Sequence, residues 1–349
     1  MVGFGVIGGG MIAPIHIAAI AKLDGAELRG AMDNGSGRAE QMAPGLDHRG
    51  SDDLRKFLAR DDIDVVCIAT PSGSHADIAI QAANAGKHCI VEKPIDISLE
   101  RIDRMIAAHE ASGTRLGGIF NTRYAPSAAL IKDAVEAGRF GQLTFASAMG
   151  PWWRDQSYYD DSDWKGTWRL DGGGALMNQG IHSIDLLQWF VDEPVVSVNG
   201  RIATLAHQNM ETEDTGAATL TFANGALGNI ACTTSMWPGH FRTISIAGSD
   251  GTAVLADNAL LFWQFREETS ADDDIRRDML QIPGQGVGAS DPAAGVDEAG
   301  HHAVFREFLD ALNAGVEPRI NGAESRKAVS LILAIYESSQ KNGAPVAPR

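Results

Sequence analysis

The first third of the chain alternates short apolar runs with segments in which apolar residues recur at helical spacing. The apolar runs at 2–7, 27–32, 64–69, 88–91 and 115–119 predict strands, and the segments at 12–21, 52–59, 76–85 and 99–111 predict helices. Strands that alternate with helices are typical of βαβ units, which build a parallel sheet. Residues 1–120 are therefore predicted to form an α/β domain with a doubly wound, Rossmann-type sheet.

The pattern changes after residue 120. Helices are predicted near 127–137, 175–191, 303–314 and 323–340, and several strands between 195 and 265 are separated by tight turns such as Asn-Gly. Consecutive strands joined by short turns pair antiparallel, so residues 121–349 are predicted to form a second, α+β domain with a mostly antiparallel sheet. The segment 267–300 is rich in Asp, Gly and Pro and is expected to be a surface excursion, with the acidic run 272–274 in a solvated loop.

The charge balance narrows the range of partners. The chain has 29 Lys and Arg against 45 Asp and Glu, a formal net charge of −16. A negative field repels phosphate backbones and anionic lipid surfaces, so neither a nucleic acid nor a membrane is an expected partner. The nearly uncharged stretch 1–21 is interrupted by five glycines, Pro14 and His16, which favours a buried strand, turn and helix over a signal peptide. Three cysteines without metal spacing are consistent with a reducing cytoplasm.

A glycine-rich turn follows the first predicted strand directly. The run from Gly8 through Gly10, Met11 and Ile12 to Ala13 fits the pattern G-x-G-x-x-A at the start of a predicted helix. Glycines at these positions permit a tight turn and let a pyrophosphate approach the backbone N–H groups of the helix N-terminus. The sequence context favours a dinucleotide site over a plain turn.

Asp33 ends the second predicted strand, where an acidic side chain can bond both ribose hydroxyls and repel a 2′-phosphate. This position favours NAD(H) over NADP(H). Two other interpretations remain open, because Asp33 also begins an Asp-Asn-Gly turn and Arg38 could reach a 2′-phosphate.

Two further segments lie where the third and fourth strands end. Ligands of open α/β sheets bind beyond the carboxyl ends of the strands, so these segments are expected to face the cofactor. They contain Thr70, Pro71, His75, Glu92 and Lys93. Burial beside an oxidised, positively charged nicotinamide would favour the neutral form of Lys93 and make it a plausible base. The alternative is an ordinary surface lysine. The Lys93–Pro94 bond is a candidate for the cis form.

A second chemical motif lies in the predicted helix 175–191, after three consecutive glycines. Asn178, His182, Asp185 and Trp189 recur at helical spacing and put different polar groups on one face. Burying such a face is costly without a ligand or partner. A single histidine on a helix is more often a core or surface residue, and only its neighbours favour a functional role here.

The segment 151–169 holds four of the seven tryptophans and two of the four tyrosines, interleaved with charged residues. Aromatic rings stack on the C–H faces of pyranoses, which makes Trp153, Trp164 and Arg169 candidates for sugar binding. A subunit interface would show the same enrichment. No metal site is expected, since the adjacent His301 and His302 would point about 100° apart on a helix.

Together with Asn121, Arg123 and Tyr124, these motifs resemble the glucose-fructose oxidoreductase, inositol dehydrogenase and rhizopine catabolism (Gfo/Idh/MocA) family over essentially the whole chain. The resemblance implies an N-terminal NAD-binding Rossmann domain and a C-terminal domain that binds substrate and uses a large open sheet for oligomerisation. It matches Lys93 and His182 to the catalytic lysine and histidine of the family. It also implies that Asn121 contacts the cofactor and that Arg123 and Tyr124 contact the substrate. Many members have Asp where this chain has Asn178, and an amide can orient substrate but cannot exchange a proton.

The expected activity is an NAD(H)-dependent transfer of hydride between nicotinamide and a ring secondary alcohol of a sugar, glycoside, nucleotide sugar or inositol. His182 would take the hydroxyl proton, alone or with Lys93, while Asn178 and Asp185 hold the geometry. A homo-dimer or homo-tetramer is expected. Two alternatives remain: a glycosidase that oxidises the ring transiently with no net redox change, and a non-catalytic NAD-binding sensor.

Overall fold

The computed structural model describes residues 1–46, 51–282 and 297–349, and the chain divides into two compact units. The first unit comprises Met1–Asn121 and Asp297–Arg326, and the second comprises Thr122–Val296 and Lys327–Arg349. The sequence-based division at residue 120 assigned the helix near 303–314 to the second domain. The structure groups this helix, α10 (Glu298–Ala314), with the first unit because it packs against α1 (Ala13–Ala21).

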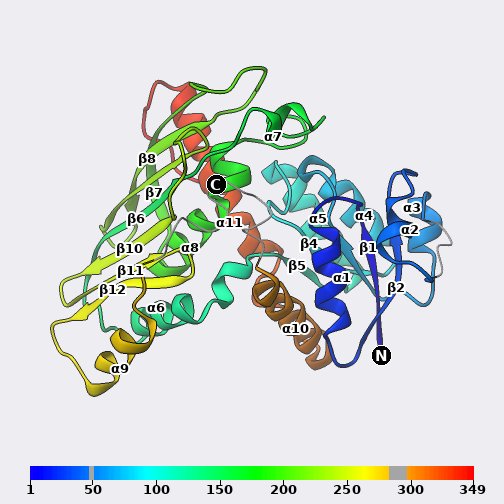
Figure 1. Ribbon diagram of the computed structural model, residues 1–349, viewed down its shortest axis with the longest axis horizontal. Coiled ribbons are helices and arrows are strands. Elements are labelled where there is room, and N and C mark those ends of the chain that lie inside the picture. Colours follow the sequence, from blue (N-terminus) through cyan, green and yellow to red (C-terminus); the bar gives the residue numbers. More distant parts are fainter. Residues whose placement is uncertain (47–50, 283–296) are drawn as a thin grey trace. The chain divides into compact units, whose positions relative to one another are not determined.

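The first unit is built on a five-stranded parallel sheet in the order β2-β1-β3-β4-β5 (Figure 1). Its strands are β1 (Val2–Ile7), β2 (Ala26–Met32), β3 (Val65–Ile68), β4 (His88–Val91) and β5 (Leu116–Gly118). Besides α1 and α10 it contains α2 (Arg38–Met42), α3 (Leu54–Leu58), η1 (Ser72–Ser74), α4 (His75–Asn84) and α5 (Leu99–Ser112). All four residues of β3 are buried, as expected for a strand covered on both faces. The Rossmann prediction is confirmed.

The second unit is built on a seven-stranded sheet in the order β12-β11-β10-β6-β9-β8-β7. Its strands are β6 (Leu143–Pro151), β7 (Val195–Ala203), β8 (Thr215–Phe222), β9 (Leu227–Thr233), β10 (Thr243–Gly248), β11 (Gly251–Ala256) and β12 (Ala259–Phe265). All neighbouring pairs are antiparallel except β6 with β9, which confirms the predicted sheet type. The sequence did not predict the central strand β6, because its buried face consists of the small residues Ala146, Ala148 and Gly150.

The described helices of the second unit are α6 (Pro126–Glu136), α7 (Ser157–Asp160), η3 (Ala175–Gly180), α8 (Ile181–Val191) and α9 (Ser270–Met279). The turn η2 (Asn121–Tyr124) and the helix α11 (Gly322–Gln340) contribute residues to both units. Helix α8 packs on β6 and β10 (Figure 1). The inward side chains of these two strands are buried.

The opposite side of the sheet carries exposed apolar side chains. Phe145 is 43% exposed and is the register partner of Leu227, which is 57% exposed. Met149 and Phe262 are each 42% exposed. We call the surface formed by these four residues the open face. Exposed apolar side chains gathered on one face of a sheet are typical of a surface that binds another protein.

The segment 267–300 differs from the predicted surface excursion. Residues 270–279 form α9, whose start has a capping box between Thr269 and Asp272. Asp272 is fully buried against Arg139 and Trp263, so the prediction of a solvated acidic run is wrong at this residue. Residues 283–296 of the segment lie outside the described residues.

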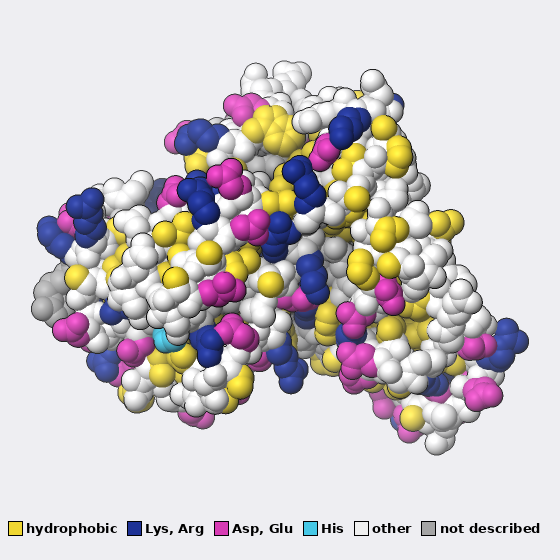
Figure 2. All heavy atoms as spheres, turned by 180° about the vertical axis from the view of Figure 1, so that it is seen from behind, with side chains coloured by type: hydrophobic (Ala, Val, Ile, Leu, Met, Phe, Trp, Pro, Cys, Tyr) yellow, Lys and Arg dark blue, Asp and Glu magenta, His cyan; other side chains and the backbone are white. Residues whose placement is uncertain are grey.

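Two surface properties bear on the possible partners. Among the described residues, no helix combines the length and the apolar character that crossing a bilayer requires. On the face drawn in Figure 2, acidic and basic side chains are interspersed rather than gathered in one basic field.

Candidate active site

The turn after β1 has the geometry of a phosphate-binding turn. Gly8 has a φ of +120°, and a Cβ atom there would lie 2.3 Å from the carbonyl oxygen of Ala69. Only glycine fits that position. By contrast, a Cβ atom at Gly10 would meet nothing within 4 Å. Ile12 is the N-cap residue of α1, and Met11 beside it is 58% exposed. Open space at Gly10, next to a helix N-terminus, fits a pyrophosphate.

Asp33 lies just beyond the end of β2, where the sequence predicted it. Its two carboxylate oxygens accept hydrogen bonds from the backbone N–H groups of Gly35, Ser36 and Ala39 and from the Ser36 hydroxyl, at 2.7–3.0 Å. Burial raises the pKa of Asp33, but the bonds from Ala39 and Ser36 outweigh burial and bring the pKa below its usual value. Asp33 is therefore a turn residue, which was one of the interpretations that the sequence left open. A bound ribose diol would use the same carboxylate that holds this loop in shape. Arg38, the first residue of α2, lies against Gly9.

The carboxyl ends of β3 and β4 are tied together by His75. Its Nδ1 lies 2.9 Å from the carbonyl oxygen of Pro94, and its Nε2 lies 2.8 Å from that of Thr70. Burial lowers the pKa of His75, while the bonds to the two carbonyl oxygens act in the opposite direction. Lys93 follows β4 and is half-buried, and the Lys93–Pro94 peptide is cis, as the sequence suggested.

Glu92 lies in a buried cluster that the sequence did not reveal. Its Oε1 lies 2.8 Å from Nε2 of His16 and 3.6 Å from Nε2 of His301, while its Oε2 accepts the N–H of Lys93. Burial raises the pKa of Glu92, but the bonds to His16 and His301 bring it well below the usual value. The cluster therefore holds an ionised carboxylate directly behind the peptide of Lys93.

The same three side chains could hold a metal ion, because one potential ligand atom from each lies within 4.8 Å of the others. Two imidazoles and a carboxylate are a donor set that Zn²⁺ accepts. In the sequence, the sign of this cluster is His16, a lone histidine on an apolar helix. Its partners Glu92 and His301 are distant in the chain, so the sequence does not connect the three residues. Since His16 already bonds to Glu92, the cluster also has a role that needs no metal.

Asn121 ends the continuous part of the first unit and is 5% exposed. Its Oδ1 is buried and has no hydrogen-bond partner among the described residues. Buried polar atoms are nearly always paired, so such an atom is typical of a position completed by a ligand. The open space at Gly10 and this unpaired oxygen both fit a bound dinucleotide.

In the second unit, the helix with the candidate catalytic residues begins with a π-helical segment, η3, rather than the continuous α-helix predicted from the sequence. Glu213 caps it: its carboxylate accepts the N–H groups of Gly174 and Leu176, and its backbone carbonyl accepts that of Ala175. A Cβ atom at Gly174 would lie 2.1 Å from this carbonyl, which explains the glycine. Burial raises the pKa of Glu213. The hydroxyl group of Tyr336 donates a hydrogen bond to the same carboxylate. π-Helical turns occur frequently at functional sites.

Asn178, in η3, is 8% exposed, and its side-chain nitrogen donates to Oδ1 of Asp171 at 2.7 Å. His182, in the first turn of α8, is half-buried. Asp185 is buried and forms a two-pronged ion pair with Arg123, at 2.7 and 2.6 Å. The structure therefore brings two predicted site residues, Arg123 and Asp185, together with each other, and Arg123 also lies over the ring of Trp189. Tyr124, the next residue, is half-buried at the end of η2.

The aromatic segment 151–169 contacts η3 through Arg154, which follows the predicted sugar-binding residue Trp153. Arg154 is 3% exposed and donates to Oε1 of Gln179, and the ammonium group of Lys165 lies 3.7 Å from the ring centre of Tyr158. Of the predicted sugar-binding residues, Trp153 packs edge-on against Trp237, Trp164 is half-buried, and Arg169 is exposed.

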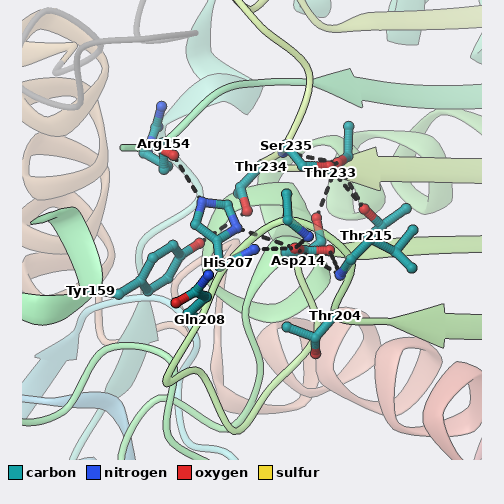
Figure 3. A network of polar contacts seen from close by, with 12 residues as sticks. Arg154, Tyr159, Thr204, His207, Gln208, Asp214, Thr215, Thr233, Thr234 and Ser235 are labelled. Atoms are coloured by element: carbon teal, nitrogen blue, oxygen red, sulfur yellow. Dashed lines mark hydrogen bonds and ion pairs between the residues drawn. The ribbon is translucent and has the colours of Figure 1, made fainter. Parts of the chain in front are cut away.

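A polar network centred on His207 and Asp214 fixes this region (Figure 3). The carboxylate of Asp214 accepts the N–H groups of residues 205–207. The ring of His207 reaches the carbonyl oxygen of Arg154 at 2.8 Å, and the Tyr159 hydroxyl bonds to that of Thr234. Since Asp214 follows Glu213, the network also positions the cap of η3.

Comparison with known proteins gives family matches for both units. Residues 2–119 match a family model described as "Oxidoreductase family, NAD-binding Rossmann fold", and residues 128–254 match one described as "GFO/IDH/MocA C-terminal domain".

Several individual proteins are also similar. The WlbA dehydrogenase from Bordetella pertussis, solved with NADH and UDP-GlcNAcA, is 35% identical with a TM-score of 0.88, covering 99% of this chain and 97% of its own. A levoglucosan dehydrogenase solved with NADH and levoglucosan is 25% identical with a TM-score of 0.82, covering 99% of both chains. The inositol 2-dehydrogenase of Rhizobium meliloti is 29% identical over 73% of this chain and 75% of its own.

Proposed function

Because the chain belongs to the Gfo/Idh/MocA family of NAD-binding oxidoreductases, we propose that it oxidises or reduces a ring carbon of a nucleotide-linked sugar. The observation that carries this choice is the similarity over 99% of the chain to the WlbA dehydrogenase that was solved with NADH and UDP-GlcNAcA. Simple glycosides and inositols, on which less similar relatives act, are the next candidates.

The cofactor is NAD, and the residues that would hold it are the turn Gly8–Gly10 with Met11 and Ile12, Asp33 with Arg38, the strand ends at Thr70, Pro71, His75, Glu92 and Lys93, and Asn121. When bound, it supplies the carbon that accepts or returns a hydride. The open space at Gly10 and the unpaired Oδ1 of Asn121 support this assignment.

His182 takes the proton from the sugar hydroxyl, alone or together with Lys93. Asn178 orients the substrate, and Arg123, Tyr124, Trp153, Trp164 and Arg169 are proposed to contact it. Asp185 acts through Arg123, since both oxygens of its carboxylate bond to that guanidinium. The buried carboxylate of Glu92 keeps the Lys93 peptide in place.

The test is NADH formation, followed at 340 nm, with UDP-sugars, glycosides, aldoses and cyclitols, using NAD and NADP separately. Lys93→Ala and His182→Ala are each expected to lower kcat/KM by at least about 100-fold. The exposed Lys56→Ala and His240→Ala serve as controls in the same two units. Turnover within a few-fold of the parent in both active-site variants would contradict the mechanism. Sugar release from retained NAD without net NADH would indicate a glycosidase instead.

The assembly and location belong to the same proposal. The open face supports a homo-dimer or homo-tetramer, because pairing would remove its apolar side chains from water. Light scattering should then give a mass that is a multiple of 37.1 kDa, and Phe145→Glu should reduce this mass.

All three cysteines are free and buried, and burial raises the pKa of the Cys232 thiol to about 12. Unpaired thiols support a reducing, cytoplasmic location.

A further inference from the structure

We propose that Asp171 is a positioning residue for the reaction: its carboxylate fixes the amide of Asn178 so that the amide presents its oxygen to a donor group of the substrate. This inference rests on the proposed function for its catalytic meaning. The geometry that supports it lies entirely within the second unit.

The first observation is the direct contact. Nδ2 of Asn178 lies 2.7 Å from Oδ1 of Asp171, and Asp171 is completely buried. An ionised carboxylate only accepts hydrogen bonds, so the NH₂ end of the amide must face it. The amide oxygen then points away from Asp171, and a flipped amide would set two oxygens against each other.

The second observation is that Asp171 is itself held firmly. Its Oδ2 accepts the N–H of Gly166 at 2.8 Å, and its own N–H donates to the carbonyl oxygen of Thr167 at 3.1 Å. Gly166 has a φ of +71°, which places its N–H in a tight turn that glycine adopts readily. The carboxylate therefore cannot follow Asn178 if the amide rotates.

The third observation concerns charge. The ammonium group of Lys165 and the guanidinium of Arg154 both lie over the ring of Tyr158, at 3.7 and 5.6 Å from its centre. Lys165 and Asp171 attract each other electrostatically. The ammonium group of Lys165 therefore offsets part of the negative charge that is buried at Asp171.

The chemical consequence follows from polarisation. An amide that donates to an anion becomes a stronger acceptor at its oxygen, particularly in a buried site. The oxygen of Asn178 would accept a hydrogen bond from the hydroxyl or amide N–H next to the carbon that reacts. His182, four residues further along the helix, is the residue proposed to take the proton of the reacting hydroxyl. The site would therefore select rings with a hydrogen-bond donor beside the oxidised carbon.

Exchange of the Asn178 side-chain protons tests the orientation without any substrate. In ¹H–¹⁵N spectra the pair is identified by its loss in Asn178→Asp. One proton of the pair should be protected in the parent and become unprotected in Asp171→Asn. Fast exchange of both protons in the parent would overturn the proposal, whatever the activity assays show.

A double-mutant cycle tests the catalytic meaning. With UDP-GlcNAcA or the best substrate found, Asp171→Asn should raise KM about tenfold and leave the Kd for NADH unchanged. Asn178→Asp should be worse, because two carboxylates then face each other. The double variant Asp171→Asn/Asn178→Asp restores one carboxylate and one amide and should recover most of the loss relative to Asn178→Asp.

A purely structural Asp171 would behave differently. Asp171→Asn would then lower Tm and the active fraction with KM unchanged, and the double variant would be no better than Asn178→Asp. Either result would refute the inference. If Asp171→Asn does not fold, the comparison of Asn178→Asp with the double variant still decides. Asp161→Asn, an exposed change in the same segment, is the control. Loss of turnover in His182→Ala tests the proposed function separately.

Discussion

Replacing two glycines of the same turn by alanine should separate folding from cofactor binding. At Gly10 a Cβ atom would meet nothing within 4 Å, and the residue does not have a positive φ. Gly10→Ala should therefore raise the free energy of unfolding by about 0.4–1 kcal/mol, because alanine restricts the unfolded chain. For a unit of about 150 residues, this corresponds to a rise in Tm of roughly 1–4 °C.

The same methyl group should block the cofactor. A pyrophosphate that approaches the helix N-terminus needs the space at Gly10, so Gly10→Ala should weaken NADH binding at least tenfold, or about 1.4 kcal/mol. Gly8→Ala is the contrasting variant, since its Cβ would lie 2.3 Å from the carbonyl oxygen of Ala69 at a φ of +120°. Backbone strain and the clash should together cost about 2–6 kcal/mol of stability.

Calorimetry without ligand gives the two Tm values, and titration of NADH at 25 °C gives the two dissociation constants. The expected combination is a stable Gly10→Ala that binds NADH weakly and an unstable Gly8→Ala. If Gly10→Ala binds NADH within twofold of the parent, the turn does not hold the pyrophosphate. If Gly8→Ala is as stable as the parent, the argument from the close approach to Ala69 is wrong.

Three further predictions concern charged side chains. Asp33→Asn keeps the side-chain shape and removes the charge that repels a 2′-phosphate, so the kcat/KM ratio of NAD to NADP should fall at least tenfold; an unchanged ratio would assign the preference elsewhere. Asp185→Asn leaves a buried guanidinium on Arg123 without the Asp185 carboxylate and should cost about 3–5 kcal/mol in denaturant unfolding, against little for Asp133→Asn at an exposed position of α6 in the same unit. The hydrogen bond from Arg139 holds the pKa of Asp272 well below its usual value. This carboxylate therefore stabilises the fold at pH values above its unfolded pKa of about 4. The stabilisation is lost as the pH falls below that value. Asp272→Asn should cost about 2 kcal/mol at pH 7 and flatten the fall of Tm below pH 4, whereas an acid transition identical to that of the exposed Asp274→Asn would contradict the assignment.

The strands of the first unit, the turn after β1 and the helix carrying His182 could be predicted from the sequence because their signals are local. Apolar runs bounded by glycines specify short buried strands, and three glycines before a helical pattern specify a tight entry into a helix. Even the cis Lys93–Pro94 peptide was suggested by a proline directly after a strand. The π-helical form of residues 175–180 was not, since it depends on the cap that Glu213 supplies from 37 residues away in the chain.

The sequence by itself determined the two kinds of sheet, the position of the glycine turn and the family motifs, because each depends on the order of neighbouring residues. Only the tertiary structure decided that β6 lies at the centre of its sheet, that α10 packs in the first unit, and that Glu92 bonds to His16, 76 residues distant. It also put Asp171 behind Asn178. Such contacts form between side chains whose separation in the chain carries no periodic signal, and their free energy depends on burial that exists only after the elements pack.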